Sequence, residues 1–466
     1  MRKPSRILIG FILGFFLLIS FACNFPLGDA LLLTKEYSPT RTPRPTKNSG
    51  GGFFPTRVPK ITITSEGFSP SETRPATDPL RIETRSYYPS MDNRPHDLGY
   101  RVTIKNPDRS YTIRNAIFQV TVRDTNGEVV GQKNHYVTVG PLEDTQIVSF
   151  FTVPDITKAN SMGVKQINPG QAIPSLPGED QIRVSRISYA KGYDSPMVTG
   201  EVTSTFIEDI SGPFYTAVAY DTNGNIIGLG SQLSGPLPAG GTVPVAIPLD
   251  LSVEPAKVDL VFTPDGPTYF EPHSEFKLTV EKADVIPNTS GYSGGVVMIL
   301  HNPDPTRMAM TAYYTAAAYD AAGNVLATCY GPVPGVLFPG ERQGFGCQLF
   351  LSEESVPVRA EVFTLVSDAE TPYNDIMTNP LTADNISLNV YKVTATIHNT
   401  LPRNLKYCYA LIVAYDVSGK LAGQAFYHLD TMTAKESRQI EIGLYLGDTP
   451  VVRVEVFPVI SSGTFW

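Results

Sequence analysis

Four copies of one short pattern recur along the chain, and they constrain its fold more than any other feature. Each copy is a hydrophobic stretch that ends in Asp-x-x-Gly, with its aspartate at Asp124, Asp221, Asp320 or Asp416. These aspartates are 97, 99 and 96 residues apart. A period near one hundred residues matches a whole domain, whereas solenoids repeat every ~20–50 residues. The spacing therefore predicts four tandem domains with separate cores.

The segments around each marker predict the kind of domain. An alternating apolar stretch comes first and ends at Asn106, Ser204, Asn302 or Asn399, 17 or 18 residues before the aspartate. More short alternating stretches follow, divided by turns rich in proline and glycine. Short strands at this spacing are typical of antiparallel sandwiches. The expected fold class is therefore all-β, with one antiparallel β-sandwich in every copy.

The marker itself predicts a turn. Aspartate at i and glycine at i+3 favour a type I turn whose glycine takes the left-handed conformation and joins two antiparallel strands. The alternative interpretation of the marker is a calcium-binding loop, because Asp124-Thr-Asn126 resembles the start of a loop that binds calcium through carboxylates. The later acidic ligands of such loops are missing, so we expect hairpins and no metal.

Composition and boundaries agree with this plan. With 40 prolines, 38 glycines and a single tryptophan, the chain suits strands and turns better than long helices. Its 37 basic and 45 acidic residues leave no positive excess for a phosphate backbone, so no nucleic-acid partner is expected. We expect a signal peptide over 1–22, a Pro/Ser/Thr-rich disordered stalk over 23–79, and sandwiches over 80–172, 173–268, 269–370 and 371–466.

The first residues predict export. Arg2, Lys3 and Arg6 precede an apolar run over 7–22, which is shorter than the roughly 20 residues that a membrane span needs. The run ends in Ile19-Ser-Phe-Ala-Cys23, which resembles a bacterial lipoprotein lipobox. The resemblance implies that the Cys23 thiol receives a diacylglycerol and that the membrane lipid is a partner. A single-span anchor stays the alternative.

Three of the four markers follow a tyrosine, at Tyr220, Tyr319 and Tyr415, whereas Arg123 stands at the corresponding place in the first copy. With the asparagine strand upstream and the Pro-Gly turn downstream, these copies resemble the FxLYD-type bacterial domain. Alanine or isoleucine replaces the phenylalanine and leucine of the family's name. The resemblance implies immunoglobulin-like sandwiches in an exported protein, and it implies no chemistry.

The same tyrosines are the predicted contact residues. By the period-two rule, the second, fourth and sixth places before each marker aspartate face the core, so Tyr220, Tyr319 and Tyr415 face the other way. Three outward tyrosines in successive domains favour a contact stripe for a polymer or an extended protein. The alternative is that each ring packs on a cross-strand neighbour of its own sheet.

Four cysteines give two further expectations. With Cys23 lipidated, Cys329 and Cys347 are the expected disulfide, because a hairpin folded at the turn that begins at Phe338 would bring them face to face. Two buried thiols are the alternative for this pair. Cys408 lies in an alternating apolar stretch and is expected to be a small core residue.

No catalytic constellation stands out. The G-x-S-x-G string around Ser293 needs a strand before it and a helix after it, but a strand pattern follows. The six histidines form no i, i+4 pair. We therefore expect no catalytic residue, no metal and no cofactor, and a protein that is not an enzyme.

The expected function is that of an exported, lipid-anchored binding or spacer protein. It would present its sandwiches to an extracellular protein or glycan from the outer face of the bacterial cytoplasmic membrane or the cell surface. The alternative is a single-span, membrane-anchored accessory subunit of an envelope enzyme or transport complex.

Overall fold

The computed structural model describes residues 80–88, 97–153, 155–179, 181–190, 192, 195–251, 253–262, 266–287, 294–352, 354–372, 376–446 and 449–465. All of them belong to the second of two compact units, which begins at Ile61. The predicted signal peptide, Cys23, all of the predicted stalk and Ser293 lie outside the described residues. Within the described ranges, no helix is long and apolar enough to cross a membrane.

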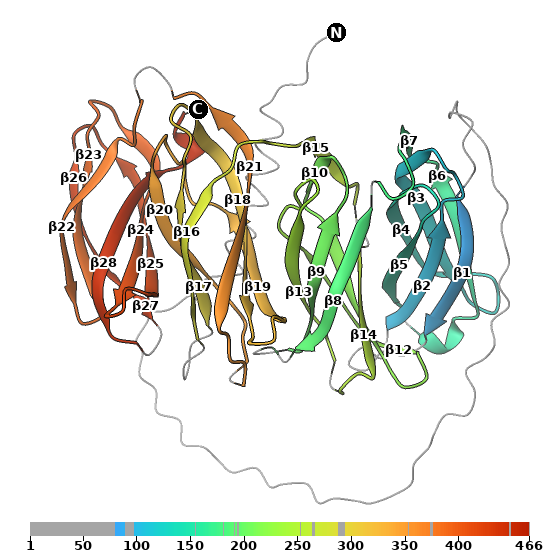
Figure 1. The fold of residues 1–466 in the computed structure, drawn as a ribbon. Helices are drawn as coiled ribbons and strands as arrows, with labels where there is room; N and C mark the ends of the chain where they lie inside the picture. The colour runs from blue at the N-terminus through green and yellow to red at the C-terminus, as the bar shows by residue number, and fades with distance from the viewer. Residues whose placement is uncertain are drawn as a thin grey trace, which may run out of the picture. The chain divides into compact units, whose positions relative to one another are not determined.

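The described residues are strands and loops with two short 3-10 helices, η1 (Ile156–Lys158) and η2 (Ser462–Phe465), and the all-β prediction is confirmed (Figure 1). The strands of repeat 1 are β1 (Arg81–Tyr88), β2 (Asp97–Lys105), β3 (Tyr111–Arg123), β4 (Val129–Val139), β5 (Asp144–Thr152), β6 (Ser161–Asn168) and β7 (Gln171–Pro174). Those of repeat 2 are β8 (Ile182–Ala190), β9 (Met197–Ser204), β10 (Glu208–Ser211), β11 (Phe214–Tyr220), β12 (Ile226–Leu233), β13 (Thr242–Pro248), β14 (Lys257–Phe262) and β15 (Tyr269–Pro272).

Repeats 3 and 4 follow the same order. Repeat 3 has β16 (Thr279–Ile286), β17 (Gly295–His301), β18 (Met308–Tyr319), β19 (Val325–Pro332), β20 (Arg342–Gln348) and β21 (Arg359–Glu370). Repeat 4 has β22 (Leu381–Asn389), β23 (Lys392–Asn399), β24 (Leu405–Asp416), β25 (Leu421–Met432), β26 (Ser437–Gly443), β27 (Tyr445–Leu446) and β28 (Val451–Ile460).

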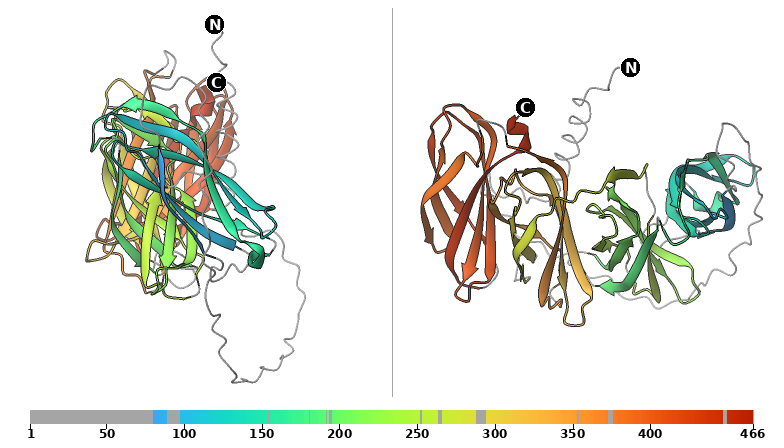
Figure 2. Two further views of the ribbon diagram at one scale, coloured as in Figure 1. Left: turned by 90° about the vertical axis from the view of Figure 1, so that its right-hand side faces the viewer. Right: turned by 45° about the horizontal axis from the view of Figure 1, so that its top comes forward.

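Every repeat pairs its strands in one pattern, which produces two antiparallel sheets (Figure 2). The sheets that we call front sheets are β1-β2-β5, β8-β9-β13, β16-β17-β20 and β22-β23-β26. The sheets that we call back sheets are β4-β3-β6, β12-β11-β14, β19-β18-β21 and β25-β24-β28. The recurrence of one topology four times confirms the four tandem immunoglobulin-like sandwiches.

The core lies between the front and back sheets, where the period-two rule places it. The core-facing side chains of the four central back strands are all buried, as predicted: Phe118, Val120 and Val122; Tyr215, Ala217 and Ala219; Tyr314, Ala316 and Ala318; Ala410, Ile412 and Ala414. Alternation along one strand therefore fixes which face of its own sheet each side chain occupies.

The marker forms the predicted hairpin turn in each repeat. In the first, Gly127 has φ +84° and its N–H donates to the Asp124 carbonyl at 3.1 Å. Asp124 Oδ1 accepts the N–H groups of Asn126 and Glu128, both at 2.8 Å. Gly224, Gly323 and Gly419 have φ values of +80°, +83° and +81°. The carboxylate therefore stabilises its own turn.

Two short strands run past the predicted domain boundaries. β7 pairs with β3 of repeat 1 beyond residue 172, and β15 pairs with β10 of repeat 2 beyond residue 268. β7 extends the back sheet of repeat 1, whereas β15 forms a separate two-stranded sheet with β10. Composition does not reveal this strand pairing. The sheets of repeats 1 and 2 thus reach Pro174 and Pro272.

Candidate functional site

The three marker tyrosines point away from their own cores but are not exposed. Tyr220, Tyr319 and Tyr415 have relative exposures of 4%, 1% and 3%. The expectation of an exposed contact stripe is therefore wrong. The physical reason is that the outer face of each of these back sheets packs against the preceding repeat.

The first and third junctions show this packing directly. Tyr220 clusters with Val148 and Phe150 of β5, and Arg101 Nη1 of β2 donates to its hydroxyl at 3.3 Å. Tyr415 clusters with Val297 and Ile299 of β17. Each ring thus contacts the front sheet of the repeat before its own.

The second junction is similar but more polar around the ring. Strands β9 and β13 of repeat 2 contact β19, the neighbour of the strand that carries Tyr319. Burial raises the pKa of Tyr319 to about 12, and the negative charge of Glu201 on β9 acts in the same direction. Since Tyr319 is nearly inaccessible, it cannot serve an outside partner in this arrangement.

Each tyrosine ring also has a cationic partner from its own sheet. The charged groups of Lys257, Arg359 and Arg453 lie 5.5, 4.0 and 3.7 Å from the centroids of the three rings. These residues are the cross-strand partners of Tyr220, Tyr319 and Tyr415, and each forms an ion pair with the acid two positions later, Asp259, Glu361 or Glu455. Each ring therefore also packs on a cross-strand neighbour of its own sheet, which is the alternative that the sequence left open.

Repeat 1 lacks this whole set of residues. Arg123 replaces the tyrosine, its cross-strand partner is Ser161, and Gly163 stands where the acid would be. Arg123 is exposed, and its guanidinium donates to the carbonyl of Gly127 at 2.9 Å. The missing tyrosine, base and acid in one copy were a sequence signal that its back sheet differs from the others.

Two glycines allow close approach between repeats 3 and 4. A Cβ atom on Gly344 of β20 would lie 2.6 Å from Phe457 and 2.8 Å from Val413, both in the back sheet of repeat 4. One on Gly346 would lie 2.7 Å from the carbonyl oxygen of Val296 in its own repeat and 2.9 Å from Gln424 of β25. Gly344 is tight because side chains of the next repeat occupy the space that a larger residue would need, and Gly346 is confined by both its own repeat and the next one.

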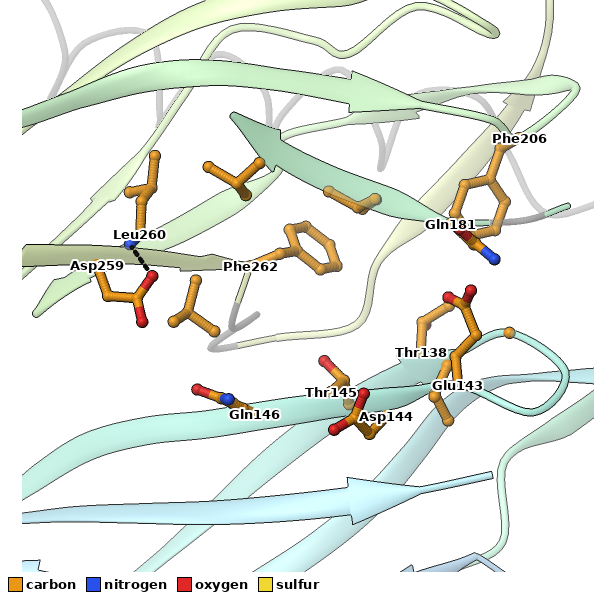
Figure 3. Close-up of a pocket in the computed structure, with 15 residues that line it drawn as sticks. Thr138, Glu143, Asp144, Thr145, Gln146, Gln181, Phe206, Asp259, Leu260 and Phe262 are labelled. Carbon is orange, nitrogen blue, oxygen red and sulfur yellow. Dashed lines mark hydrogen bonds between the residues drawn. The ribbon is translucent and has the colours of Figure 1, made fainter. Parts of the chain in front are cut away.

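A cleft of about 250 Å³ lies where the turn after β4 and strand β5 meet repeat 2 (Figure 3). Repeat 1 lines it with polar side chains, among them Thr138, Glu143, Asp144, Thr145 and Gln146. Repeat 2 lines it with a mixed set: Gln181, Ile182, Val184, Phe206, Asp259, Leu260, Val261 and Phe262. The walls therefore combine carboxylates, amides and apolar surface.

The junction between repeats 1 and 2 contains a buried arginine. Arg114 Nη2 lies 2.6 Å from a carboxylate oxygen of Glu208, and its guanidinium is 4.0 Å from the ring centroid of Phe270. Next to it, the Asn115 side chain accepts the Thr268 N–H at 2.8 Å and donates to the Thr268 carbonyl at 3.0 Å. These contacts hold one end of the junction without using the acids of the cleft.

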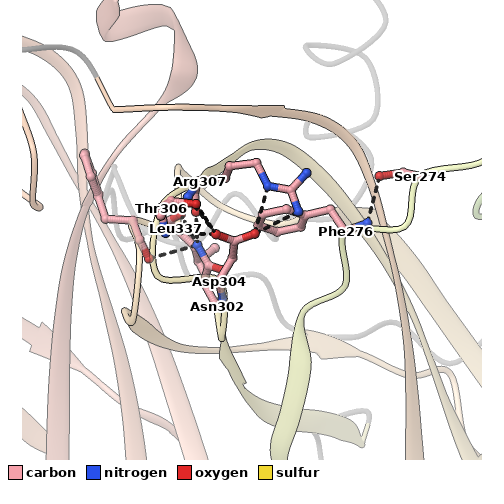
Figure 4. A network of polar contacts seen from close by, with 8 residues as sticks. Ser274, Phe276, Asn302, Asp304, Thr306, Arg307 and Leu337 are labelled. Carbon is pink, nitrogen blue, oxygen red and sulfur yellow. Dashed lines mark hydrogen bonds and ion pairs between the residues drawn. The ribbon is translucent and has the colours of Figure 1, made fainter.

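The asparagines upstream of the markers have a structural role. Asn302 is fully buried, and its Nδ2 donates to the carbonyls of Arg307, Leu337 and Phe338 at 2.8, 3.1 and 3.0 Å (Figure 4). Its Oδ1 accepts the Asp304 N–H at 3.0 Å. Asn106 and Asn399 make the same set of bonds. Each fixes the loop after a front strand to the turn that changes sheets.

The neighbouring loop is ordered by its own carboxylate. Asp304 accepts the N–H groups of Thr306 and Arg307 at 2.9 Å, and the Arg307 guanidinium lies 2.8 Å from its other oxygen. These bonds, led by that from Thr306, lower the pKa of Asp304. The same guanidinium is 4.8 Å from the Phe276 ring centroid, so this acid also serves structure.

One row of polar side chains has the composition of a serine-hydrolase triad. His398 Nδ1 lies 2.7 Å from the Ser437 hydroxyl, and Nε2 lies 3.0 Å from the Asp384 carboxylate. The row occupies the outer face of the front sheet of repeat 4, and the Asp384 side chain is 58% exposed. Water screens such a pair. Acyl transfer also needs oxyanion donors in a water-excluded site, so we assign the row no reaction.

Cys329 of β19 and Cys347 of β20 are bonded, with Cα atoms 6.2 Å apart. The hairpin expectation is nevertheless wrong, because β19 belongs to the back sheet and β20 to the front sheet. The turn between them carries the chain from one sheet to the other, so the bond crosses the sandwich. Cys408 is buried and free, and burial raises its thiol pKa to about 11.

A non-reducing peptide map should therefore recover the Cys329 and Cys347 peptides as one linked species, with Cys408 alkylated only after unfolding. The Cys347→Ser variant should lose the linked species while Cys408 behaves as before. Alkylation of both Cys329 and Cys347 in the untreated native protein would contradict the bond.

No protein-family model matches the chain, and no curated protein matches it. Among solved structures, it is similar to dimeric latent PorU from Porphyromonas gingivalis, with 10% identity and a TM-score of 0.12 over 82% of this chain and 34% of that one. It is also similar to E. coli alpha-2-macroglobulin, with 10% identity and a TM-score of 0.11 over 83% of this chain and 28% of that one. The chain thus spans about a third or less of the length of either protein.

Proposed function

We propose that this chain is a bacterial surface lipoprotein of tandem FxLYD-type domains. It is anchored through Cys23 on the outer face of the cytoplasmic membrane or on the cell surface, and it holds and presents its sandwiches to an extracellular protein. It acts by binding and spacing, without catalysis. The lipobox resemblance at Cys23 and the Pro/Ser/Thr-rich stretch over 23–79 support the anchor and the stalk.

The observation that carries the spacer part is the burial of one tyrosine at each junction. Domains joined only by flexible linkers would leave these rings exposed, and relative motion is the default for domains with small interfaces. Here the junctions bury Tyr220, Tyr319 and Tyr415 with apolar and charged neighbours from two repeats. Coupled repeats suit a protein that keeps a binding domain at a distance from a membrane.

The anchor is tested by Cys23→Ala in the full chain. We expect this variant to lose incorporation of a radioactive fatty acid and to leave the membrane fraction, because a stable anchor needs the acyl chains. Cys408→Ala, which changes only a buried thiol, should keep its label. Unchanged labelling of Cys23→Ala would contradict the lipoprotein proposal, and an unlabelled wild-type chain that stays in the membrane would favour the single-span alternative.

The binding part is tested by cross-linking the full chain in intact cells and identifying what is captured. We expect at least one extracytoplasmic protein to be captured by the four-repeat chain and not by a chain that ends before residue 80. Capture that depends only on residues 1–79 would assign partner binding to the stalk and would contradict the proposal.

A further inference from the structure

One glutamate stands at the same place in three of the four repeats, in the turn that leads into the last strand of the front sheet. The three are Glu143, Glu341 and Glu436, and Gly241 holds this place in repeat 2. The main-chain carbonyl of each glutamate accepts the N–H of the recurring asparagine of its own repeat. Because the backbone is the same, any difference between the three carboxylates comes from what surrounds the turn.

The glutamate of repeat 4 shows this turn in contact with water. Glu436 Oε2 accepts the Thr433 N–H at 2.6 Å, and its other oxygen accepts the Arg438 Nε–H at 2.8 Å. In the described structure no later repeat covers the turn. These contacts, led by the bond from Thr433, lower the pKa of Glu436. The uncovered turn therefore favours an ionised carboxylate.

In repeat 3 the same carboxylate reaches the next repeat. Glu341 Oε2 accepts the Phe338 N–H at 2.8 Å, as its counterpart does, but Oε1 accepts the Asn379 Nδ2–H at 2.5 Å. Asn379 lies in the linker before β22, and its Nδ2 also donates to the Pro458 carbonyl of β28 at 2.7 Å. The carboxylate thus joins the turn of repeat 3 to the linker and the last strand of repeat 4. We call this contact the joint.

The turn of the joint also enters the core of repeat 4. Met308, Met310, Val336 and Phe338 of repeat 3 belong to the same buried cluster as Ile397 and other core residues of repeat 4. The Val336 N–H donates to the Ile460 carbonyl across the joint at 2.9 Å. A change at the carboxyl group of this turn therefore bears directly on the contact between the two repeats.

The bases near the joint are engaged with other acids. Arg342 pairs with Glu281 at 2.6 Å and lies 3.7 Å from a carboxylate oxygen of Glu455. Arg307 pairs with Asp304. The linker over 376–381 and the end of β28 over 456–460 carry no titratable side chain. The remaining titratable neighbours on the packed elements are His301 on β17, Cys408 and Tyr409 on β24, His428 on β25 and Arg453 on β28. Within the described ranges, Glu341 forms no ion pair.

Burial without a positive partner disfavours the ionised form of a carboxyl group. Burial raises the pKa of Glu341 from its ordinary value of 4.5 to about 7, against the opposing effect of the bonds from Phe338 and Asn379. Glu143, which lies beside repeat 2, changes in the same direction. The covered and uncovered copies of one turn therefore differ in the sign of the shift.

Linkage turns this difference into a statement about the joint. A group whose pKa rises when a contact forms binds its proton more tightly in the closed state, so loss of the proton opposes closure. For Glu341 the stabilisation is complete below 4.5 and is lost as the pH rises through about 7. Opening returns water to the charged carboxylate.

We propose that the contact between repeats 3 and 4 is a pH-sensitive joint with Glu341 as its sensor, closed in mildly acidic surroundings and progressively opened as the surroundings become neutral and then alkaline. Opening releases the 333–341 turn from the linker and from β28 while both sandwiches stay folded. The inference goes beyond the proposed spacer function, because it gives the row of repeats a point where its stiffness is regulated.

Amide-resolved hydrogen exchange on the full chain tests the joint, with each rate corrected for the intrinsic effect of pH. The Val336 amide reports opening, because its bond crosses to Ile460. Its opening constant should rise about tenfold or more between about pH 5 and about pH 8, since each unit between two pKa values is a factor of ten. The Ala309 amide, which bonds Leu337 within repeat 3, should keep its protection.

The variant Glu341→Gln cannot ionise, so the protection of the Val336 amide should no longer depend on pH over this range. Glu436→Gln is the matched control, because it changes the same turn of repeat 4 and should keep the parent's profile. The double variant His301→Gln, His428→Gln should also keep it, which separates the glutamate from the histidines that titrate over the same range. If Glu341→Gln folds poorly, Asn379→Ala gives a second test. It removes one bond that lowers the pKa of Glu341, so the rise in opening should extend to higher pH.

Three results would overturn the proposal. They are equal protection of the Val336 amide across the range in the parent chain, a pH dependence that persists in Glu341→Gln, and one that disappears in the histidine variant. Exchange is measured without a partner or a membrane, so these results leave the proposed anchoring and binding untouched. Failure of those functions would likewise leave the joint standing.

Discussion

The triple variant Tyr220→Ser, Tyr319→Ser, Tyr415→Ser is expected to melt well below the parent protein and to lose cooperative unfolding across repeats. Each ring is at most 4% exposed and packs at a junction between two repeats. Removing a large buried aromatic side chain costs about 3–5 kcal/mol where the site cannot collapse. Serine also leaves Lys257, Arg359 and Arg453 without the aromatic face beside them. Thermal unfolding followed by circular dichroism measures the effect.

The control is Tyr269→Ser with Tyr391→Ser, two tyrosines that are 63% and 62% exposed. We expect it to shift the melting temperature little, since surface substitutions usually change stability by under about 0.5 kcal/mol. If instead the triple junction variant melts like its parent while partner capture is lost, the tyrosines would belong to a binding surface and the junctions described above would not form in solution.

The second large effect is expected for Asn302→Ala. The change deletes three donated bonds and one accepted bond in a fully buried position. Each buried polar group left without a partner costs about 1–3 kcal/mol. We therefore expect a loss of about 4 kcal/mol or more, enough to unfold repeat 3 at moderate temperature.

Asn324→Ala provides the matched comparison, because Asn324 is exposed and its side chain only bonds the marker carboxylate of Asp320. Denaturant unfolding of both variants should separate them by several kcal/mol. Similar small effects for the two substitutions would show that water can replace the buried amide. That result would contradict the structural role assigned to the recurring asparagine.

The parts of the fold that could be predicted from sequence are those set by local rules. Asp and Gly three residues apart dictate the turn at Gly127 and its equivalents wherever they occur. Alternation dictates which side of a strand faces its own core, and the burial of Phe118 and Ile412 follows from it. Four repetitions of the same signals then suffice for four sandwiches.

The covering of the tyrosines could not be predicted in the same way. Alternation places Tyr415 on the outer face of its sheet but says nothing about what another domain lays on that face. The signal in the sequence is that the tyrosine, base and acid are absent together in repeat 1, where Arg123, Ser161 and Gly163 stand. Such joint absence indicates a shared role in one interface.

The wrong hairpin expectation at the disulfide and the cleft that was not predicted have a common cause. A turn at Phe338 is visible in sequence, but whether it closes a hairpin or crosses between sheets depends on which strands pair, and the sheet order gives the second answer. The cleft is assembled from loops of two repeats, so Glu143 looks no different from Glu341 or Glu436 until their hydrogen bonds are compared.

The outer faces at the two ends of the row of repeats limit how such a protein can be lengthened. The back sheet of repeat 1 presents Gln119, Thr121 and Arg123, and the front sheet of repeat 4 presents Thr396, Gln439 and Glu441. Joining a further copy to either face would desolvate polar groups that have no partners across the new contact. A lineage can therefore add domains by duplicating an internal copy, such as repeat 3, more readily than by appending one. Repeat 1 moved to an internal position would bury Gln119, Thr121 and Arg123 at a contact without the tyrosine, base and acid of the other junctions.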